Sequence, residues 1–235
     1  MEVHVAVAKV PKFGLQESGD TVEQVERPRG GVTLVMADGQ THGRAAKWIS
    51  HLVAAKAAQL IADGVRDGAV ARGVHDYLHA IRDGKVSAEL IMVSVDVRTR
   101  SLVIARNTHV PVFLRLEDGR VERLDPYVEP IGVHAVMKPR ITEVPLQPGL
   151  VVLAFTDGLF SAGGRYGRQW EPGELEAEVS SAQPHEMQAL VERILNRAMA
   201  MDQNRPADDM SVMALGLGPG RPEQPVRRMT ATVPL

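Results

Sequence analysis

Two apolar segments, each followed by an Asp-Gly dipeptide, constrain the fold of this chain more than any other feature. They cover residues 32–37 and 150–155, and the dipeptides are Asp38-Gly39 and Asp157-Gly158. Short runs of aliphatic and β-branched residues are typical of strands buried in the middle of a sheet. Carboxylates at the ends of such strands can converge at one edge of a sheet. These positions are therefore the first candidates for a functional site.

Alternating apolar residues and turn signals predict further strands around these two. Asp118-Gly119 lies between two alternating segments, which is a strong signal for a β-hairpin. A second hairpin is expected where residues 88–97 and 101–105 alternate. The predicted strands are residues 3–10, 22–25, 32–37, 88–97, 101–105, 110–116, 120–124, 141–145, 150–155 and 210–217.

Apolar residues at helical spacing predict helices at residues 42–62, 69–81, 174–179 and 186–201. In the first helix the residues expected to face inward are Ala45, Trp48, Ile49, Leu52, Val53, Ala57, Leu60 and Ile61. In the second they are Val70, Val74, Tyr77, Leu78 and Ile81. Because two helices are inserted among hairpin-linked strands, we expect an α+β layered sandwich rather than alternating βαβ units. No internal repeat or low-complexity linker divides the chain, so one domain is the simpler account.

Composition excludes several classes of site. The chain has no cysteine, which rules out disulfides, zinc-thiolate sites, iron–sulfur clusters and cysteine nucleophiles. The net charge of −2 gives no sign of nucleic-acid binding. The N-terminus lacks the basic and apolar segments of a signal peptide, and no apolar run approaches the length that spans a bilayer. We therefore expect a cytoplasmic protein that binds neither nucleic acid nor membrane.

Several acidic residues lie near the ends of predicted strands, from which they could share a metal ion. They are Asp20, Asp38, Asp157, Asp208 and Asp209. The glycine after Asp38 and after Asp157 lets the backbone bend and brings a carbonyl oxygen close to a ligand. Hard oxygen ligands without cysteine suit Mg²⁺ or Mn²⁺ rather than zinc. Ordinary turn chemistry is the alternative, because Asp-Gly is common at strand ends.

Four blocks of sequence together resemble the type 2C metal-dependent protein phosphatases, and most closely the bacterial branch that controls sporulation and stress sigma factors. Their order and approximate spacing match that family, and the resemblance covers about residues 3–217. The blocks are Ser18-Gly19-Asp20, residues 35–46 around Asp38-Gly39, residues 153–159 around Asp157-Gly158, and Asp208-Asp209-Met210-Ser211-Val212. Weaker similarities are Asn107-Thr108-His109-Val110-Pro111, Pro130-Ile131-Gly132 and Gly167.

The resemblance implies a four-layer α-β-β-α sandwich, in which two antiparallel sheets are flanked by helices. The catalytic domain would be residues 1–217, and residues 218–235 would be a tail rich in Gly, Pro and Arg. The resemblance also implies a binuclear Mn²⁺ or Mg²⁺ centre. Asp38 would bridge both metals, Asp20 and the Gly39 carbonyl would bind the second, and Asp157 and Asp208 the first. Asp209 would lie next to the centre, although either member of the Asp208-Asp209 pair could be the ligand.

The implied activity is hydrolysis of phosphoserine or phosphothreonine by water that the metals activate, with Asp38 and Asp157 as the catalytic residues. The implied partner is a phosphoprotein substrate such as an anti-anti-sigma factor, and the sequence leaves a homodimer open. An enzyme with an aspartyl nucleophile is disfavoured, because residues 36–38 lack the first Asp of that motif. A catalytically silent relative that acts as a binding or regulatory module remains the alternative.

Departures from the family pattern concern the general acid and the loop geometry. The branch usually has Gly at the position of Thr41, and animal members often have His at the position of Gln40. His42 could approach a leaving group, but it is better explained as the start of a helix. His109 is predicted to be structural and to bond a backbone carbonyl, and His75 and His79 to lie on a solvated helix face. Thr21 stands where the family often has an aromatic residue, directly after the first Gly-Asp pair.

Overall fold

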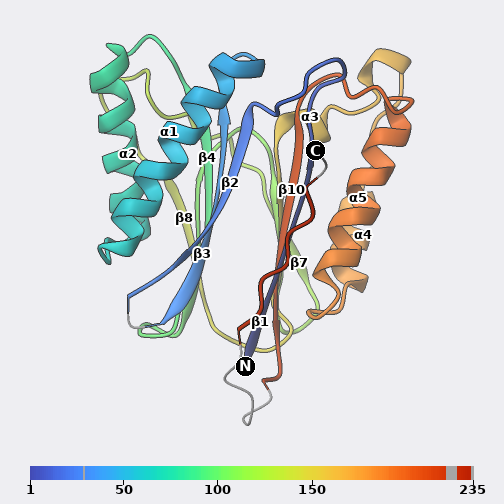
Figure 1. The fold of residues 1–235 in the computed structure, drawn as a ribbon. Helices are drawn as coiled ribbons and strands as arrows, with labels where there is room; N and C mark the ends of the chain where they lie inside the picture. Colours follow the sequence, from blue (N-terminus) through green and yellow to red (C-terminus); the bar gives the residue numbers. More distant parts are fainter. Residues whose placement is uncertain (29, 221–226, 234–235) are drawn as a thin grey trace.

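The computed structural model describes residues 1–28, 30–220 and 227–233. In this part of the chain, two five-stranded antiparallel sheets pack face to face, and helices cover the outer face of each (Figure 1). One sheet has the order β1-β10-β9-β6-β7 and the other has the order β2-β3-β4-β5-β8. The predicted α+β sandwich with four layers, α-β-β-α, is confirmed.

The strands of the first sheet are β1 (Glu2–Val10), β6 (Val112–Arg115), β7 (Val121–Leu124), β9 (Val151–Phe155) and β10 (Met210–Gly218). Those of the second are β2 (Asp20–Glu26), β3 (Gly31–Gly39), β4 (Ala88–Asp96), β5 (Ser101–Asn107) and β8 (Arg140–Pro145). The second sheet is covered by α1 (Gly43–Ala62) and α2 (Asp67–Arg82), and the first by α4 (Glu174–Ser181) and α5 (Met187–Met201). The short α3 (Asp157–Phe160) and the 3-10 turn η1 (Gly164–Tyr166) follow β9.

The core consists of three apolar layers. The middle layer lies between the sheets and contains residues such as Leu34, Ile104 and Leu215. A second layer lies between α1, α2 and their sheet, and a third between α4, α5 and theirs. A central strand with apolar residues on both faces is buried only when all four layers are present. This explains why residues 34–37 of β3 and all of β9 are apolar.

Both predicted hairpins are present. β4 pairs with β5, and β6 pairs with β7 through a turn in which Gly119 has φ +84°. That φ lies in the left-handed region, which glycine adopts without steric cost.

Some side chains predicted to face inward are exposed. Trp48 of α1 is 50% exposed, and Tyr77 and Ile81 of α2 are 37% and 43% exposed. Ala45 is also exposed. The apolar stripe of each helix is therefore narrower than the sequence pattern indicates. Trp48 instead lies beneath a cation, because the Cζ atom of Arg82 is 5.1 Å from its ring centroid.

The prediction of a solvated histidine face on α2 is wrong for His75. His75 is 2% exposed, and its Nδ1 accepts a hydrogen bond of 3.1 Å from the Gly132 N–H. The Nδ1 of His79 lies 3.1 Å from the Gly132 carbonyl oxygen. Both rings are thus used to hold the segment before β8 against α2, a contact between parts of the chain far apart in sequence.

The described residues of the predicted tail form neither helix nor strand beyond Gly218. Residues 221–226 and 234–235 of that prediction lie outside the described residues, as does Arg29. The domain boundary at residue 217 stays a prediction. None of the helices in the described part of the chain is long and apolar enough to cross a bilayer.

Candidate active site

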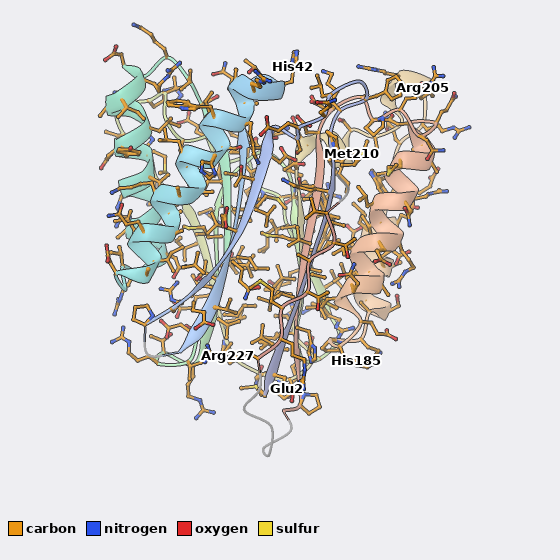
Figure 2. The ribbon with its side chains drawn as sticks, in the orientation of Figure 1. Glu2, His42, His185, Arg205, Met210 and Arg227 are labelled. Atoms are coloured by element: carbon orange, nitrogen blue, oxygen red, sulfur yellow. The ribbon has the colours of Figure 1, made fainter. Side chains whose placement is uncertain are left out.

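A cavity of about 270 Å³ opens at the end of the sandwich where β3 ends and β10 begins. Figure 2 labels His42 and Met210 at this end of the molecule, and Glu2 and His185 at the opposite end. Most of the lining comes from strand ends and the loops beside them. The lining residues are Asp38, Gly39, Gln40, Thr41, Ser87, Ala88, Glu89, His109, Pro130, Asp157, Asp208 and Asp209.

The topology explains how acidic residues from distant parts of the chain meet here. Asp38 is next to last in β3, and Asp157 follows β9. Because β9 and β10 are antiparallel neighbours, the end of β9 lies beside the segment that precedes β10, which contains Asp208. A Cβ on Gly158 would lie 2.1 Å from the Asp209 carbonyl oxygen, so only glycine permits this approach.

Asp20 does not line the cavity. It lies opposite Asp38 in the β2–β3 register and is 1% exposed. Its Oδ2 accepts hydrogen bonds from Thr156 Oγ1 at 3.0 Å and from Ser211 Oγ at 2.6 Å. Its Oδ1 is buried without a hydrogen-bond partner among the described residues. The Asp20 carboxylate thus lies on the strand next to Asp38, and its hydrogen bonds connect the two sheets.

The backbone around Asp20 is fixed by α1 and β1. Lys47 of α1 donates to the Asp20 carbonyl oxygen at 2.9 Å, and Lys9 of β1 donates to the same oxygen at 3.3 Å. The Ser50 hydroxyl donates to the Gly19 carbonyl oxygen. Burial lowers the pKa of the Lys47 ammonium, and the neighbouring Lys9 lowers it further. The Asp20 loop is therefore anchored from two layers of the fold.

Burial and mutual repulsion dominate the electrostatics of the cluster. Burial raises the pKa of Asp38 from 3.8 to about 10, and Asp20, Asp157, Glu89 and Asp208 add to the increase. Burial also raises the pKa of Asp20 to about 6, against the lowering effect of the bonds from Ser211 and Thr156. The pKa of Asp157 is raised by burial first and then by Glu89 and Asp208. Such a cluster requires protons or cations to offset its charge.

Asp208 and Asp209 both line the cavity but differ in their contacts. The Asp209 carboxylate accepts a hydrogen bond of 3.0 Å from the Lys12 N–H, and Asp208 accepts one of 3.0 Å from the Asp209 N–H. Asp209 is buried and Asp208 is half-buried. The predicted assignment of Asp208 as the ligand is compatible with these contacts and stays a prediction.

Glu89 also lines the cavity, although no local sequence pattern marks it, and the prediction that His109 bonds a backbone carbonyl is wrong. Glu89 lies opposite Asp38 in the β3–β4 register. His109 contacts the Glu89 carboxylate through Nδ1, not a backbone carbonyl, because strand pairing brings this acid beside the loop after β5. The signal that could have found Glu89 is the β3–β4 pairing, which is not local in sequence.

The two departures at the end of β3 differ in their structural consequences. Thr41 has φ +84°, a left-handed conformation that favours glycine and strains a β-branched residue. Gln40 accepts a hydrogen bond from the Ser87 N–H at 2.9 Å and so ties two parts of the cavity rim together. His42 immediately precedes α1 and does not line the cavity.

The donor set fits Mn²⁺ or Mg²⁺. It consists of carboxylates and one carbonyl oxygen, it includes the unpaired Oδ1 of Asp20, and its acidic groups repel one another. In the part of the chain that the structure describes, no three histidine or acidic side chains are arranged to share one ion as they stand.

The fold is that of the type 2C phosphatases, with the acidic cavity at one end of the sandwich. The chain belongs to the SpoIIE family, described as stage II sporulation protein E, whose sequence profile matches residues 28–217. No curated protein sequence matches this chain.

Three solved structures illustrate the similarity of fold. The SpoIIE phosphatase domain with a regulatory fragment, from Bacillus subtilis, is 16% identical with a TM-score of 0.79, over 92% of this chain and 64% of that one. The SiaA phosphatase domain of Pseudomonas aeruginosa is 22% identical with a TM-score of 0.73, over 91% and 85%. RsbX in complex with magnesium is 15% identical with a TM-score of 0.71, over 92% and 96%. The chain thus spans less than two thirds of the first of these.

Proposed function

We propose that this protein is a metal-dependent serine/threonine phosphatase that acts on a phosphorylated regulatory protein in the cytoplasm. The observation that carries the proposal is the cavity in which Asp38, Asp157 and Asp208 meet from three separate segments. Membership of the SpoIIE family supports the same reaction class. The proposed substrate is a phosphoserine or phosphothreonine protein such as an anti-anti-sigma factor.

The proposed ligands of two Mn²⁺ or Mg²⁺ ions are the carboxylates of Asp20, Asp38, Asp157 and Asp208 and the carbonyl of Gly39, with Asp209 beside them. When bound, such ions make a water molecule more acidic and neutralise charge on the phosphoryl oxygens.

The protein itself contributes a fixed framework. Glycines at the end of β3 and just after β9 let the backbone approach closely, and bonds from Lys47 and Ser50 anchor the loop that carries Asp20. Fixed charges of this kind need little reorganisation during the reaction, which is why preorganisation lowers the barrier.

The test is hydrolysis of p-nitrophenyl phosphate with Mn²⁺, with Mg²⁺ and with EDTA. We expect activity only with metal, and a loss of ~100-fold or more in kcat for Asp38→Asn and for Asp157→Asn. Asp63→Asn is the matched control, because Asp63 is an exposed carboxyl at the far end of α1.

Metal binding by isothermal titration separates the outcomes. An inactive wild type that still binds metal would indicate a silent regulatory relative. A wild type that is active in EDTA, or that binds no Mn²⁺ or Mg²⁺, would overturn the proposal.

A further inference from the structure

One part of the cavity wall is a hydrogen-bonded pair that lies outside the proposed set of metal ligands. Nδ1 of His109 contacts Oε1 of Glu89, and both residues line the cavity. The side chain of His109 is 49% exposed and that of Glu89 is 15% exposed. An imidazole is thus presented at the surface of the cavity with a carboxylate behind it.

Glu89 is held in place by the chain around it. The Thr108 hydroxyl donates to Oε2 at 2.6 Å, and the His109 N–H donates to Oε1 at 3.2 Å. Because Glu89 lies opposite Asp38 in the β3–β4 register, its side chain is on the same side of the sheet as that acid. The carboxylate therefore has a fixed position from which it can orient the ring.

The position of His109 is also fixed. It lies between Thr108 and Val110, which are both 0% exposed, and the Val110 N–H donates to Thr108 Oγ1 at 3.0 Å. With Nδ1 directed at Glu89, the other ring nitrogen, Nε2, has no hydrogen-bond partner among the described residues. A carboxylate that orients one imidazole nitrogen leaves the other available for proton transfer.

We propose that His109 is the general acid that protonates the leaving group, and that Glu89 is its positioning residue; this assignment rests on the phosphatase function proposed above. A hydroxide oxygen forms a bond to phosphorus while the bond from phosphorus to the serine or threonine oxygen breaks. The electron pair of that bond stays on the side-chain oxygen, which takes the Nε2 proton of the His109 imidazolium. The products are phosphate and the free hydroxyl, and the neutral ring regains a proton from water.

Other residues of the cavity suit this role less well. The carboxyl groups of the proposed ligands Asp38, Asp157 and Asp208 must be ionised to bind metal, and the Asp209 carboxylate accepts a hydrogen bond from the Lys12 N–H. The described residues that line the cavity include no lysine, arginine, tyrosine or second histidine. Gln40, at the end of β3, has an amide that cannot act as an acid, and His42 lies outside the lining.

Two substrates with different leaving groups test the assignment. p-Nitrophenolate leaves as a stable anion and needs little help from an acid, whereas the alkoxide of a phosphothreonine peptide needs a proton. For His109→Gln with saturating Mn²⁺, we expect kcat on the peptide to fall ~100-fold or more, and kcat on p-nitrophenyl phosphate to fall far less, under ~10-fold. Glu89→Gln should show the same split with a smaller loss on the peptide. His42→Gln is the matched control and should show no split.

A second variant guards against a folding defect. His109→Ala leaves space at an exposed position, so added imidazole should restore part of the peptide rate, and thermal melting should show a folded protein. Equal losses of His109→Gln on both substrates, or no loss on the peptide, would overturn the assignment. Weaker Mn²⁺ binding by Glu89→Gln together with equal losses would make Glu89 a metal ligand instead. If wild type hydrolyses neither substrate, the proposed function itself fails and this assignment with it.

Discussion

At the scale of single residues, Asp38 links the stability of the metal-free protein to pH. Its pKa is raised from 3.8 to about 10 by burial and by neighbouring carboxylates. Between these pH values the folded protein holds a proton that the unfolded chain releases. The free energy of unfolding therefore falls as pH rises through this window. Bound cations would offset the charge of ionised Asp38, so the free energy of unfolding would then fall less with pH.

We predict that Asp38→Asn flattens this dependence. In EDTA, the melting temperature of wild type should fall between about pH 6 and about pH 9, and the melting temperature of Asp38→Asn should fall less. At the upper pH, Asp38→Asn should be more stable than wild type by at least about 1.4 kcal/mol, the equivalent of one pKa unit. Asp63→Asn should keep the wild-type slope, and saturating Mn²⁺ should reduce it. Equal slopes for wild type and Asp38→Asn would show that Asp38 is not the group responsible.

At the scale of elements, the junction between β3 and α1 sets the shape of the cavity. Gly39 ends β3 and α1 begins at Gly43, and a Cβ on Gly39 would lie 2.2 Å from the Ala46 carbonyl oxygen. The first turn of α1 therefore packs directly on the strand that carries Asp38. This contact leaves no space for any side chain at residue 39.

We predict that Gly39→Ala displaces α1 and costs about 1–3 kcal/mol of stability, as overpacking usually does. Metal affinity should fall as well, because Lys47 and Ser50 of α1 anchor the Asp20 loop. Chemical denaturation and Mn²⁺ titration measure the two effects. Gly164→Ala is the control, since its Cβ would meet nothing within 4 Å. Unchanged metal affinity in a destabilised Gly39→Ala protein would show that the packing of α1 does not control the metal site.

The sequence was sufficient for most elements because strands and helices differ in period and because Asp-Gly marks turns. Periodicity was wrong for Trp48 and Tyr77, which are exposed and contact cations instead of the core. The Cζ atom of Arg82 lies 5.1 Å from the Trp48 ring centroid, and the Nζ atom of Lys56 lies 5.3 Å from the Tyr77 ring centroid. His75 is buried for the opposite reason, since a distant loop covers it.

At the scale of the whole molecule, the site depends on contacts between the two sheets that no local pattern reveals. The four acidic blocks were visible in sequence because each stands at a strand end. The role of Glu89 was not, because it follows from the pairing of β4 with β3. The partners of Asp20 could not be predicted either, because Ser211 belongs to the opposite sheet and Thr156 directly follows β9 of that sheet.

The bond between Ser211 and Asp20 gives the last prediction, because it joins β10 to β2 at the cavity end of the sandwich. Ser211 is fully buried, and its bond of 2.6 Å is the main influence that lowers the pKa of Asp20 against burial. Ser211→Ala should therefore cost about 1–3 kcal/mol in the free energy of unfolding above about pH 6, and less in acid, where Asp20 is protonated. Urea denaturation at several pH values measures this, with the exposed Ser181→Ala as control. A cost that does not vary with pH would mean that Ser211 fills space between the sheets rather than stabilising the charge of Asp20.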